Sequence, residues 1–222
     1  MPIESLKSKL LRTRKIVKKL KAMYPGAHCS LDYSDPLQLL VATVLSAQCT
    51  DARVNKTTPA LFMKYKTASD FANAQIEDLE ELIRSTGFYK NKAKNIKGAA
   101  KAIVAKHGGK VPNRMEDLSD LPGVGRKTAN VVLGNYFGVA AMVVDTHVTR
   151  LSNHLGLVKG DNAVKLEFQL MDVVDKKDWT VFSHLLINHG REICIARRPK
   201  CSRCRLINLC PLGSKIFPQM VK

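Results

Sequence analysis

The chain has 222 residues, of which 45% are hydrophobic, enough to form the core of one large or two small domains. Its formal net charge of +17 predicts a polyanionic partner, most simply nucleic acid. The sequence contains no apolar run of ~18 residues, no lipidation signal and no signal-peptide core after Met-Pro-Ile-Glu, so we expect neither a membrane partner nor export.

Helical periodicity begins near the N-terminus. Residues 5–21 place leucine, isoleucine and valine at helical spacing, which predicts an amphipathic helix with a basic, mostly solvated outer face. Asp35-Pro36 is a typical helix start, and the almost wholly apolar stretch 37–47 predicts a buried helix. Either Thr50 or Asp51 then caps a further helix, which we expect to run to about residue 65.

Short helices are predicted at 69–74 and 76–85, and a longer one from Asn91 to His107. Gly108-Gly109 is expected to end the longer helix. Its apolar side chains define one face, and we expect its lysines on the other, solvated side: Lys92, Lys94, Lys97, Lys101 and Lys106.

A glycine-rich turn, Leu121-Pro-Gly-Val-Gly-Arg-Lys127-Thr-Ala129, joins two apolar helical patterns, the first of which is expected to open at Asn113. Pro122 cannot continue the first helix, and glycines at 123 and 125 can take positive φ. The turn therefore predicts a hairpin whose N–H groups bind a phosphate without reading a base. A cation at Lys127 would face the positive end of the helix dipole, which favours the neutral amine that a nucleophile requires. The alternative is an ordinary helix connection with a solvated lysine.

The last part of the chain predicts three more helices. The apolar run 140–144 is too short to require a sheet, and Asp145 precedes a new helical pattern as its N-cap. Two further helices are expected at about 163–174 and 178–194. Because no alternating pattern with turn signals recurs, we predict an all-α fold.

Four of the six cysteines fall close together near the C-terminus, with gaps of six, two and five residues: Cys194, Cys201, Cys204 and Cys210. In a chain that is not exported they indicate one metal centre rather than disulfides. The spacing leaves zinc and a 4Fe–4S cluster both open. Neighbouring cations are expected to lower the thiol pKa values: Arg197, Arg198, Lys200, Arg203 and Arg205. Cys29 and Cys49 lie in apolar surroundings, so we expect them to be small core residues.

Three sets of motifs in this order resemble the endonuclease III family of DNA glycosylases, in the helix–hairpin–helix superfamily. They are Ser46-Ala47-Gln48 with Thr50-Asp51, the Leu121–Ala129 hairpin with Val144-Asp145-Thr146-His147, and the cysteine run. The resemblance implies a 4Fe–4S cluster on the four cysteines and a two-domain fold. A six-helix barrel would span 29–139 and carry the hairpin, while 1–28 and 140–222 would form the cluster domain.

The resemblance also implies an activity and residue roles. The protein would be a bifunctional DNA N-glycosylase and AP lyase of base excision repair, acting as a monomer in a prokaryotic cytoplasm, on the nucleoid. Its substrate would be double-stranded DNA with an oxidised pyrimidine or an abasic site. Lys127 matches the nucleophile and Asp145 the essential aspartate. The DNA contacts would be a gap-filling Gln48, a wedge at Phe88 where relatives often have leucine, and a phosphate grip at Gly123, Val124 and Gly125.

Three other functions fit parts of the pattern. The closest rival within the superfamily is an adenine or thymine mismatch glycosylase. Adenine mismatch enzymes usually have serine at the place of Lys127 and an extra C-terminal domain. A non-catalytic DNA-binding module would need neither Lys127 nor Asp145. In that case Asp145 would only cap a helix. An iron–sulfur electron carrier would seldom carry a net charge of +17.

Overall fold

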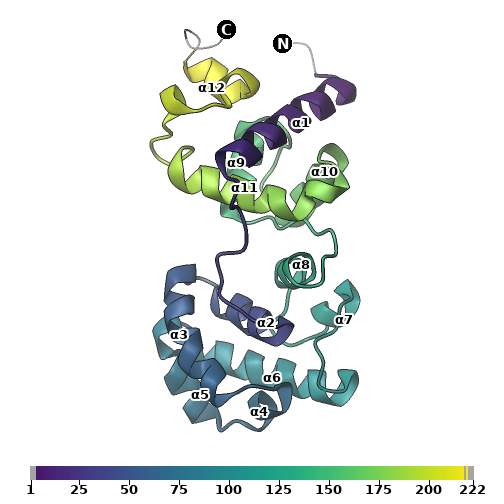
Figure 1. Ribbon diagram of the computed structural model, residues 1–222, viewed down its shortest axis with the longest axis vertical. Helices are drawn as coiled ribbons and strands as arrows, with labels where there is room; N and C mark the ends of the chain where they lie inside the picture. Colours follow the sequence, from purple (N-terminus) through teal and green to yellow (C-terminus); the bar gives the residue numbers. More distant parts are fainter. Residues whose placement is uncertain (1–3, 218, 220–222) are drawn as a thin grey trace. The chain divides into compact units, whose positions relative to one another are not determined.

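The computed structural model describes residues 4–217 and residue 219. The regular elements in this part of the chain are all helices, which confirms the all-α prediction. The chain divides into two compact units (Figure 1). A discontinuous unit joins Met1–Cys29 to Ala140–Lys222, and a continuous unit is formed by Ser30–Val139.

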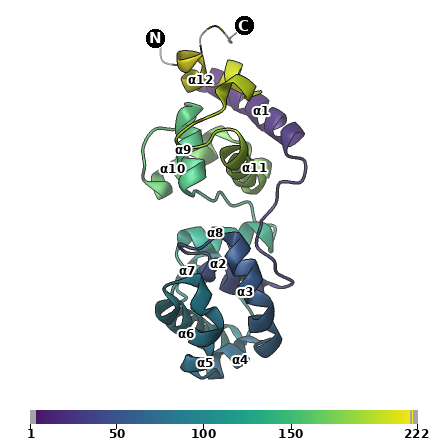
Figure 2. The same ribbon diagram turned by 90° about the vertical axis from the view of Figure 1, so that its left-hand side faces the viewer.

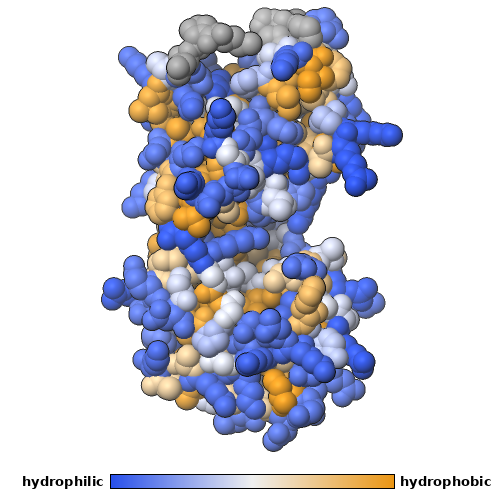
Figure 3. Space-filling view, turned by 180° about the vertical axis from the view of Figure 1, so that it is seen from behind, coloured by the Kyte–Doolittle hydropathy of each residue, from blue (hydrophilic) through white to orange (hydrophobic). Residues whose placement is uncertain are grey.

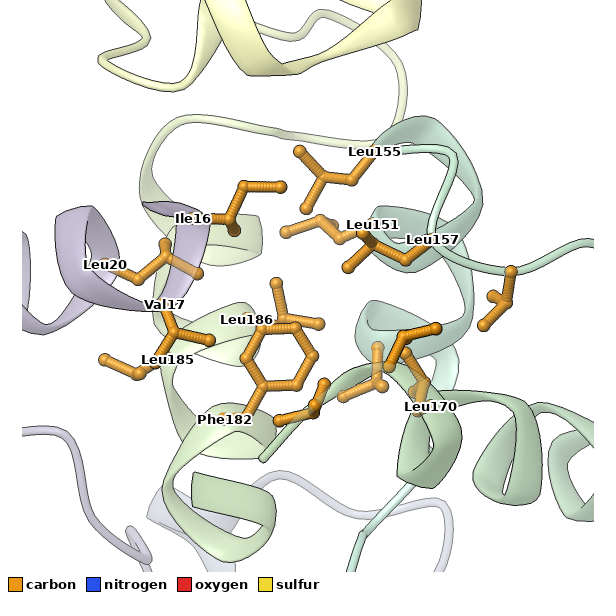
Figure 4. Packing of buried hydrophobic residues seen from close by; sticks show 14 of the residues in the cluster. Ile16, Val17, Leu20, Leu151, Leu155, Leu157, Leu170, Phe182, Leu185 and Leu186 are labelled. Carbon is orange, nitrogen blue, oxygen red and sulfur yellow. The ribbon is translucent and has the colours of Figure 1, made fainter. Parts of the chain in front are cut away.

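The discontinuous unit packs its N-terminal helix against helices from the C-terminal half of the chain. Its core surrounds Phe182 and Leu186, which are completely buried (Figure 4). Ile16 and Leu20 reach this core from the N-terminal helix, and Leu151 reaches it from a helix that follows residue 145. The helices of this unit are α1 (Leu6–Met23), α9 (Thr146–His154), α10 (Ala163–Val173), η2 (Lys176–Asp178), α11 (Trp179–Glu192), η3 (Cys201–Arg203), η4 (Ile207–Leu209) and α12 (Pro211–Ile216).

The continuous unit is organised around α6, its longest helix, against which α4 and α5 pack (Figure 2). On the other side of the unit, α8 packs against α2 and α7. The helices of this unit are α2 (Pro36–Leu45), α3 (Asp51–Lys64), α4 (Ala68–Asn73), α5 (Ile76–Ile83), η1 (Arg84–Thr86), α6 (Tyr89–His107), α7 (Met115–Ser119) and α8 (Arg126–Asn135).

The buried helix α2 begins as predicted and ends two residues early. Asp35 caps it, because its Oδ1 accepts a hydrogen bond from the N–H of Gln38 (2.9 Å), and Pro36 occupies the first turn. The helix ends at Leu45 instead of Ala47, since Gln48 has a left-handed φ of 52° and cannot continue a right-handed helix. A tight turn thus follows α2, and Thr50 caps α3.

Three expectations about α6 and its neighbours are wrong. The helix begins at Tyr89 rather than Asn91, directly after a left-handed Phe88. Helix α7 begins after Arg114 without a side-chain cap, so Asn113 does not open it. Lys92 is only 4% exposed, although the apolar pattern places it on the solvated side of the helix.

Helix α6 and the hairpin approach each other closely through two glycines. A Cβ at Gly98 would lie 3.2 Å from the Cβ of Pro122. Gly123 has a φ of +74°, and a Cβ there would lie 2.6 Å from the Cβ of Asn95. Gly125, in contrast, has a φ of −89°, so the expected need for positive φ holds at 123 and not at 125.

Hydrophilic side chains cover most of the surface of each unit on the face drawn in Figure 3. This agrees with the large excess of lysine and arginine in the sequence. Over the described part of the chain, the helices are too short or too polar to cross a membrane.

The Gly123 contact predicts an asymmetric response to alanine. We expect Gly123→Ala to lower the free energy of unfolding by about 1–3 kcal/mol, because it adds a clash with Asn95 to a strained left-handed backbone. Gly125→Ala is the matched control: a Cβ there meets no atom within 4 Å, and we expect a change within about 0.5 kcal/mol. Urea denaturation of the three proteins measures both effects, and equal stabilities would contradict the close contact.

Candidate active site and cysteine-lined cavity

The hairpin between α7 and α8 is fixed by two buried side chains, Leu121 and Val124. The N–H of Val124 donates to the carbonyl oxygen of Leu121 (3.0 Å), so this N–H is already used within the turn. Gly125 is the N-cap of α8 and makes no side-chain cap hydrogen bond to the first-turn N–H groups. These N–H groups lie at the positive end of a helix dipole, an arrangement that binds anions.

Lys127 is the second residue of α8 and its side chain is exposed. The other face of the helix buries Ala129, Val132 and Leu133, which hold α8 against the rest of the continuous unit. The first turn therefore has a fixed backbone while the lysine amine stays accessible. This is the placement that the sequence pattern predicts.

Asp145 is the N-cap of α9, as predicted: its Oδ1 accepts from the N–H of Val148 (2.8 Å). The segment before it is bound to α11 by side-chain hydroxyls. Ser183 Oγ accepts from the N–H of Val143 (3.0 Å), and Thr180 Oγ1 accepts from the N–H of Ala141 (3.4 Å). The half-buried Asp145 is therefore fixed twice: its carboxylate caps α9, and the backbone that precedes it is bound to α11.

Two histidines of the discontinuous unit are influenced by the charge of Asp145. Burial lowers the pKa of His147, and the Asp145 carboxylate opposes this shift. Burial also lowers the pKa of His184, with Asp145 again opposing. His147 lies close to Gly190, where a Cβ would come within 2.8 Å of the imidazole Nδ1. No sequence pattern pointed to His184, because a histidine inside an apolar helix pattern has no distinguishing neighbours.

Gln48 and Phe88 line one hollow of ≈ 220 Å³ on the continuous unit. They are also the two non-glycine residues with positive φ in the described part of the chain, at 52° and 49°. Both side chains are exposed, Phe88 by 67%. Left-handed backbone at residues with a Cβ is uncommon and is found at functional sites. The hollow is lined by Val44, Ala47, Gln48, Phe88, Asn91, Lys92, Asn95 and Gly123.

Lys92 also lines this hollow and is buried, although the sequence pattern predicts a solvated lysine at this position. Its Nζ donates to the carbonyl oxygens of Leu45 and Thr86, both at 2.8 Å. Burial lowers its pKa. A lysine that satisfies two backbone carbonyls cannot be told from a solvated one by spacing alone, because its partners are 47 and 6 residues away.

The four C-terminal cysteines line a single cavity of the discontinuous unit. The space open to the centre of a water molecule is ≈ 30 Å³, larger than the roughly 10–15 Å³ that one water needs. Leucine, isoleucine and proline form most of the remaining wall, together with His154 and His189. Cys29 and Cys49 do not line this cavity. Both are half-buried, so the expectation that they are core residues is wrong.

Several polar groups contact the cysteine sulfurs. His189 Nε2 lies 3.4 Å from Cys204 Sγ, and His154 Nδ1 lies 3.5 Å from Cys194 Sγ. The N–H of Gly213 donates to Cys210 Sγ (3.3 Å). These contacts hold the sulfurs in place around the cavity and are the kind that tune iron–sulfur centres.

The thiol pKa values differ from the sequence-based expectation. Burial raises the pKa of Cys194 to about 11 and also raises those of Cys201 and Cys204. The largest opposing influence on Cys194 is Arg150, not the cations beside the cysteines in sequence. Those flanking side chains are exposed, which screens their charge: Arg197, Arg198, Lys200, Arg203 and Arg205.

Arg150 places a positive charge close to Cys194. Its Nη2 donates to the carbonyl oxygen of Cys194 (2.8 Å), while its buried Nε has no hydrogen-bond partner among the described residues. A half-buried guanidinium bound to carbonyls fits an anionic thiolate centre nearby. Within the described residues, no group of three or more histidine, cysteine or acidic side chains is arranged to hold a single metal ion.

Comparison with known proteins shows which family has this sequence and fold. Residues 41–176 match the HhH-GPD superfamily of base excision DNA repair proteins. The chain is 54% identical to Endonuclease III of Synechocystis sp. over 210 residues, covering 94% of this chain and 96% of that protein. It is similar to the solved structure of a non-covalent Endonuclease III–DNA complex, with a TM-score of 0.89, 44% identity and coverage of 94% and 98%.

A second solved structure, a trapped Endonuclease III–DNA covalent intermediate, matches with a TM-score of 0.88 and 44% identity, again over 94% of this chain and 98% of that one. The hairpin, the capping aspartate and the four cysteines thus occur in a chain that matches these proteins over nearly its whole length. The chain belongs to the endonuclease III family, within the HhH-GPD superfamily of base excision DNA repair proteins.

Proposed function

We propose that this protein is a bifunctional DNA N-glycosylase and AP lyase that removes oxidised pyrimidines from double-stranded DNA. The observation that carries the proposal is the exposed Lys127 amine, held in the first turn of α8 directly after a glycine-rich hairpin. An Endonuclease III of the same family has been trapped as a covalent intermediate with DNA. Lys127 is the residue that we assign to that covalent bond here.

Residues of the continuous unit would grip and open the duplex. N–H groups of the hairpin at Gly123 and Gly125 would bind a phosphate, with buried Val124 fixing the turn. Base chemistry requires the target nucleotide to leave the stack. We assign Gln48 to the gap that it leaves, and Phe88 to a wedge in the opposite strand. Both side chains are exposed beside one hollow, which supports a shared task.

Lys127 would then act as the nucleophile. Its neutral amine attacks C1′ of the sugar, the C1′–N bond breaks, and the base leaves with the bonding electron pair and takes up a proton. As the C1′–O4′ bond breaks, O4′ takes up one of the two protons on the attached nitrogen, so that the sugar ring opens and a protonated imine joins C1′ to Nζ. The imine acidifies the hydrogen on C2′, and loss of that proton expels the 3′ oxygen with its phosphate, which breaks the strand by β-elimination.

Asp145 would support the first of these steps. Positive charge develops on the sugar as the glycosidic bond breaks, and a fixed carboxylate stabilises that charge or accepts a proton from the amine. The cap hydrogen bond to Val148 and the hydroxyl contacts of the preceding segment restrict its backbone. Preorganisation of this kind lowers the cost of aligning the charge during the reaction.

The cysteine-lined cavity fits a 4Fe–4S cluster in donor set and charge. Cys194, Cys201, Cys204 and Cys210 would hold it, and Arg150 would offset its negative charge. When bound, the cluster supplies iron–thiolate bonds that close the 194–210 segment into one loop. The exposed arginines and lysines of that segment would then face DNA phosphates. We further propose that the protein acts as a monomer, on the nucleoid of a prokaryotic cytoplasm.

Borohydride trapping tests the nucleophile. We expect the protein, incubated with a duplex carrying one thymine glycol and borohydride, to form a covalent adduct, because reduction fixes an imine. Lys127→Gln should abolish the adduct and lower strand cleavage at least a hundredfold, roughly the loss expected for a covalent catalyst. Lys101→Gln, another exposed lysine, is the control and should trap normally.

Trapping by Lys127→Gln at the normal rate would overturn the assignment of the nucleophile. Base release without any adduct from the unaltered protein would indicate a water-using, mismatch-type glycosylase. Binding with neither base release nor adduct, on an abasic as well as a thymine glycol duplex, would indicate a non-catalytic module.

Metal and sulfide analysis tests the cofactor. Protein purified without oxygen should contain iron and acid-labile sulfide in equal amounts and show visible absorbance. Cys201→Ser should lose both and unfold at a lower temperature, since cluster binding contributes to folding. Cys49→Ser, at a cysteine outside the cavity, should keep both. Stoichiometric zinc without sulfide would contradict the cluster.

A further inference from the structure

Lys92 connects the two loops that carry Gln48 and Phe88. One of its hydrogen bonds reaches the carbonyl oxygen of Leu45, the last residue of α2, three positions before Gln48. The other reaches the carbonyl oxygen of Thr86, the last residue of η1, two positions before Phe88. The backbone N–H of Lys92 also donates to the carbonyl oxygen of Phe88 (3.1 Å). One buried side chain therefore fixes the start of both loops.

The two carbonyls are groups that a lysine stabilises well. The last carbonyls of a helix have no N–H partner within the helix, and they carry the negative end of its dipole. An ammonium group placed between two such ends satisfies both at once. Because Lys92 is 4% exposed, water cannot easily replace it as the donor.

The loops need such a support because their backbones are strained. Gln48 and Phe88 have φ values of 52° and 49°, which residues with a Cβ rarely adopt. Such conformations persist only where surrounding contacts enforce them. Without the fixed carbonyls of Leu45 and Thr86, each loop is free to relax toward extended backbone, which would turn the side chains of Gln48 and Phe88 away from the hollow.

We propose that Lys92 is a positioning residue that holds the Gln48 and Phe88 loops ready for insertion into DNA. The inference rests on the proposed function, since it assigns Lys92 a role in the same opening of the duplex. Lys92 acts through the two loops and does not touch the reacting atoms. The cost of ordering the loops is then met during folding rather than on binding, which is how preorganisation raises affinity.

The chain offers a matched control on the same helix. Lys97 also lies on α6, and its Nζ donates to the carbonyl oxygen of Ala74, the C-cap of α4 (2.6 Å). Lys92→Met and Lys97→Met thus remove the same kind of bond between a lysine and the end of a helix. Only the first of them involves the two loops.

The experiment measures the dissociation constants for two duplexes of one sequence, undamaged and carrying a tetrahydrofuran abasic analogue, at fixed salt. The ratio of the two constants gives the preference for a gap. We expect Lys92→Met to reduce this preference on the order of tenfold while leaving undamaged DNA, which is bound through phosphates, nearly unchanged. Lys97→Met should lower the melting temperature and keep the preference.

A double-mutant cycle separates positioning from general loss of stability. In a protein that already carries Gln48→Ala and Phe88→Ala, adding Lys92→Met should reduce the preference no further, because the side chains it positions are gone. Lys92→Arg, which can donate to the same carbonyls, should recover most of the preference. If Lys92→Met does not fold, Lys92→Arg and Lys92→Gln take its place, with the preference expected to fall from lysine to arginine to glutamine.

An unchanged preference in Lys92→Met, or a loss that adds fully to that of the double alanine variant, would overturn the inference. Equal loss in Lys97→Met would overturn it as well. The proposed function fails in a different way: the unaltered protein would then neither prefer the abasic duplex nor form a borohydride adduct.

Discussion

The close approach of α6 to the hairpin is the constraint on which the continuous unit depends. Two glycines make it possible, because Gly98 admits Pro122 and Gly123 admits Asn95. The same helix binds the ends of α2 and η1 through Lys92, near its N-terminus. The nineteen-residue helix α6 therefore supports both the hairpin and the two loops that carry Gln48 and Phe88. Such a scaffold suits exposed loops, which tertiary contacts must hold in strained conformations.

Helix α11 has the corresponding task in the discontinuous unit. Its hydroxyl side chains bind the extended segment that leads to Asp145, and Gly190 leaves room for His147. One turn before its end, His189 contacts the sulfur of Cys204. The capping aspartate and the cysteine-lined cavity are thus built on the same helix, whose apolar face forms the core with Phe182. A substitution that displaces α11 would therefore alter both the position of Asp145 and the cysteine-lined cavity.

The charge of the molecule is used in two ways. Most basic side chains are exposed and suit a polyanionic partner without any specific geometry. A few are buried or half-buried and bind backbone carbonyls instead, as Lys92 does in one unit and Arg150 in the other. Those few help to fix the positions of the segments they bind, because a buried cation requires hydrogen-bond acceptors at defined positions.

Local signals in the sequence determined most of the longer helices, several of their caps and the hairpin. Asp35 before a proline and Asp145 before an apolar period each predict a cap that the structure contains, because capping depends on residues within one turn. The cysteine spacing predicts that the four cysteines gather around one centre, and in the structure all four line one cavity. Only the tertiary structure decided that Lys92 is buried, that burial raises the pKa of Cys194, and that Gln48 and Phe88 share a hollow. These properties depend on contacts between residues distant in sequence, which no local pattern encodes.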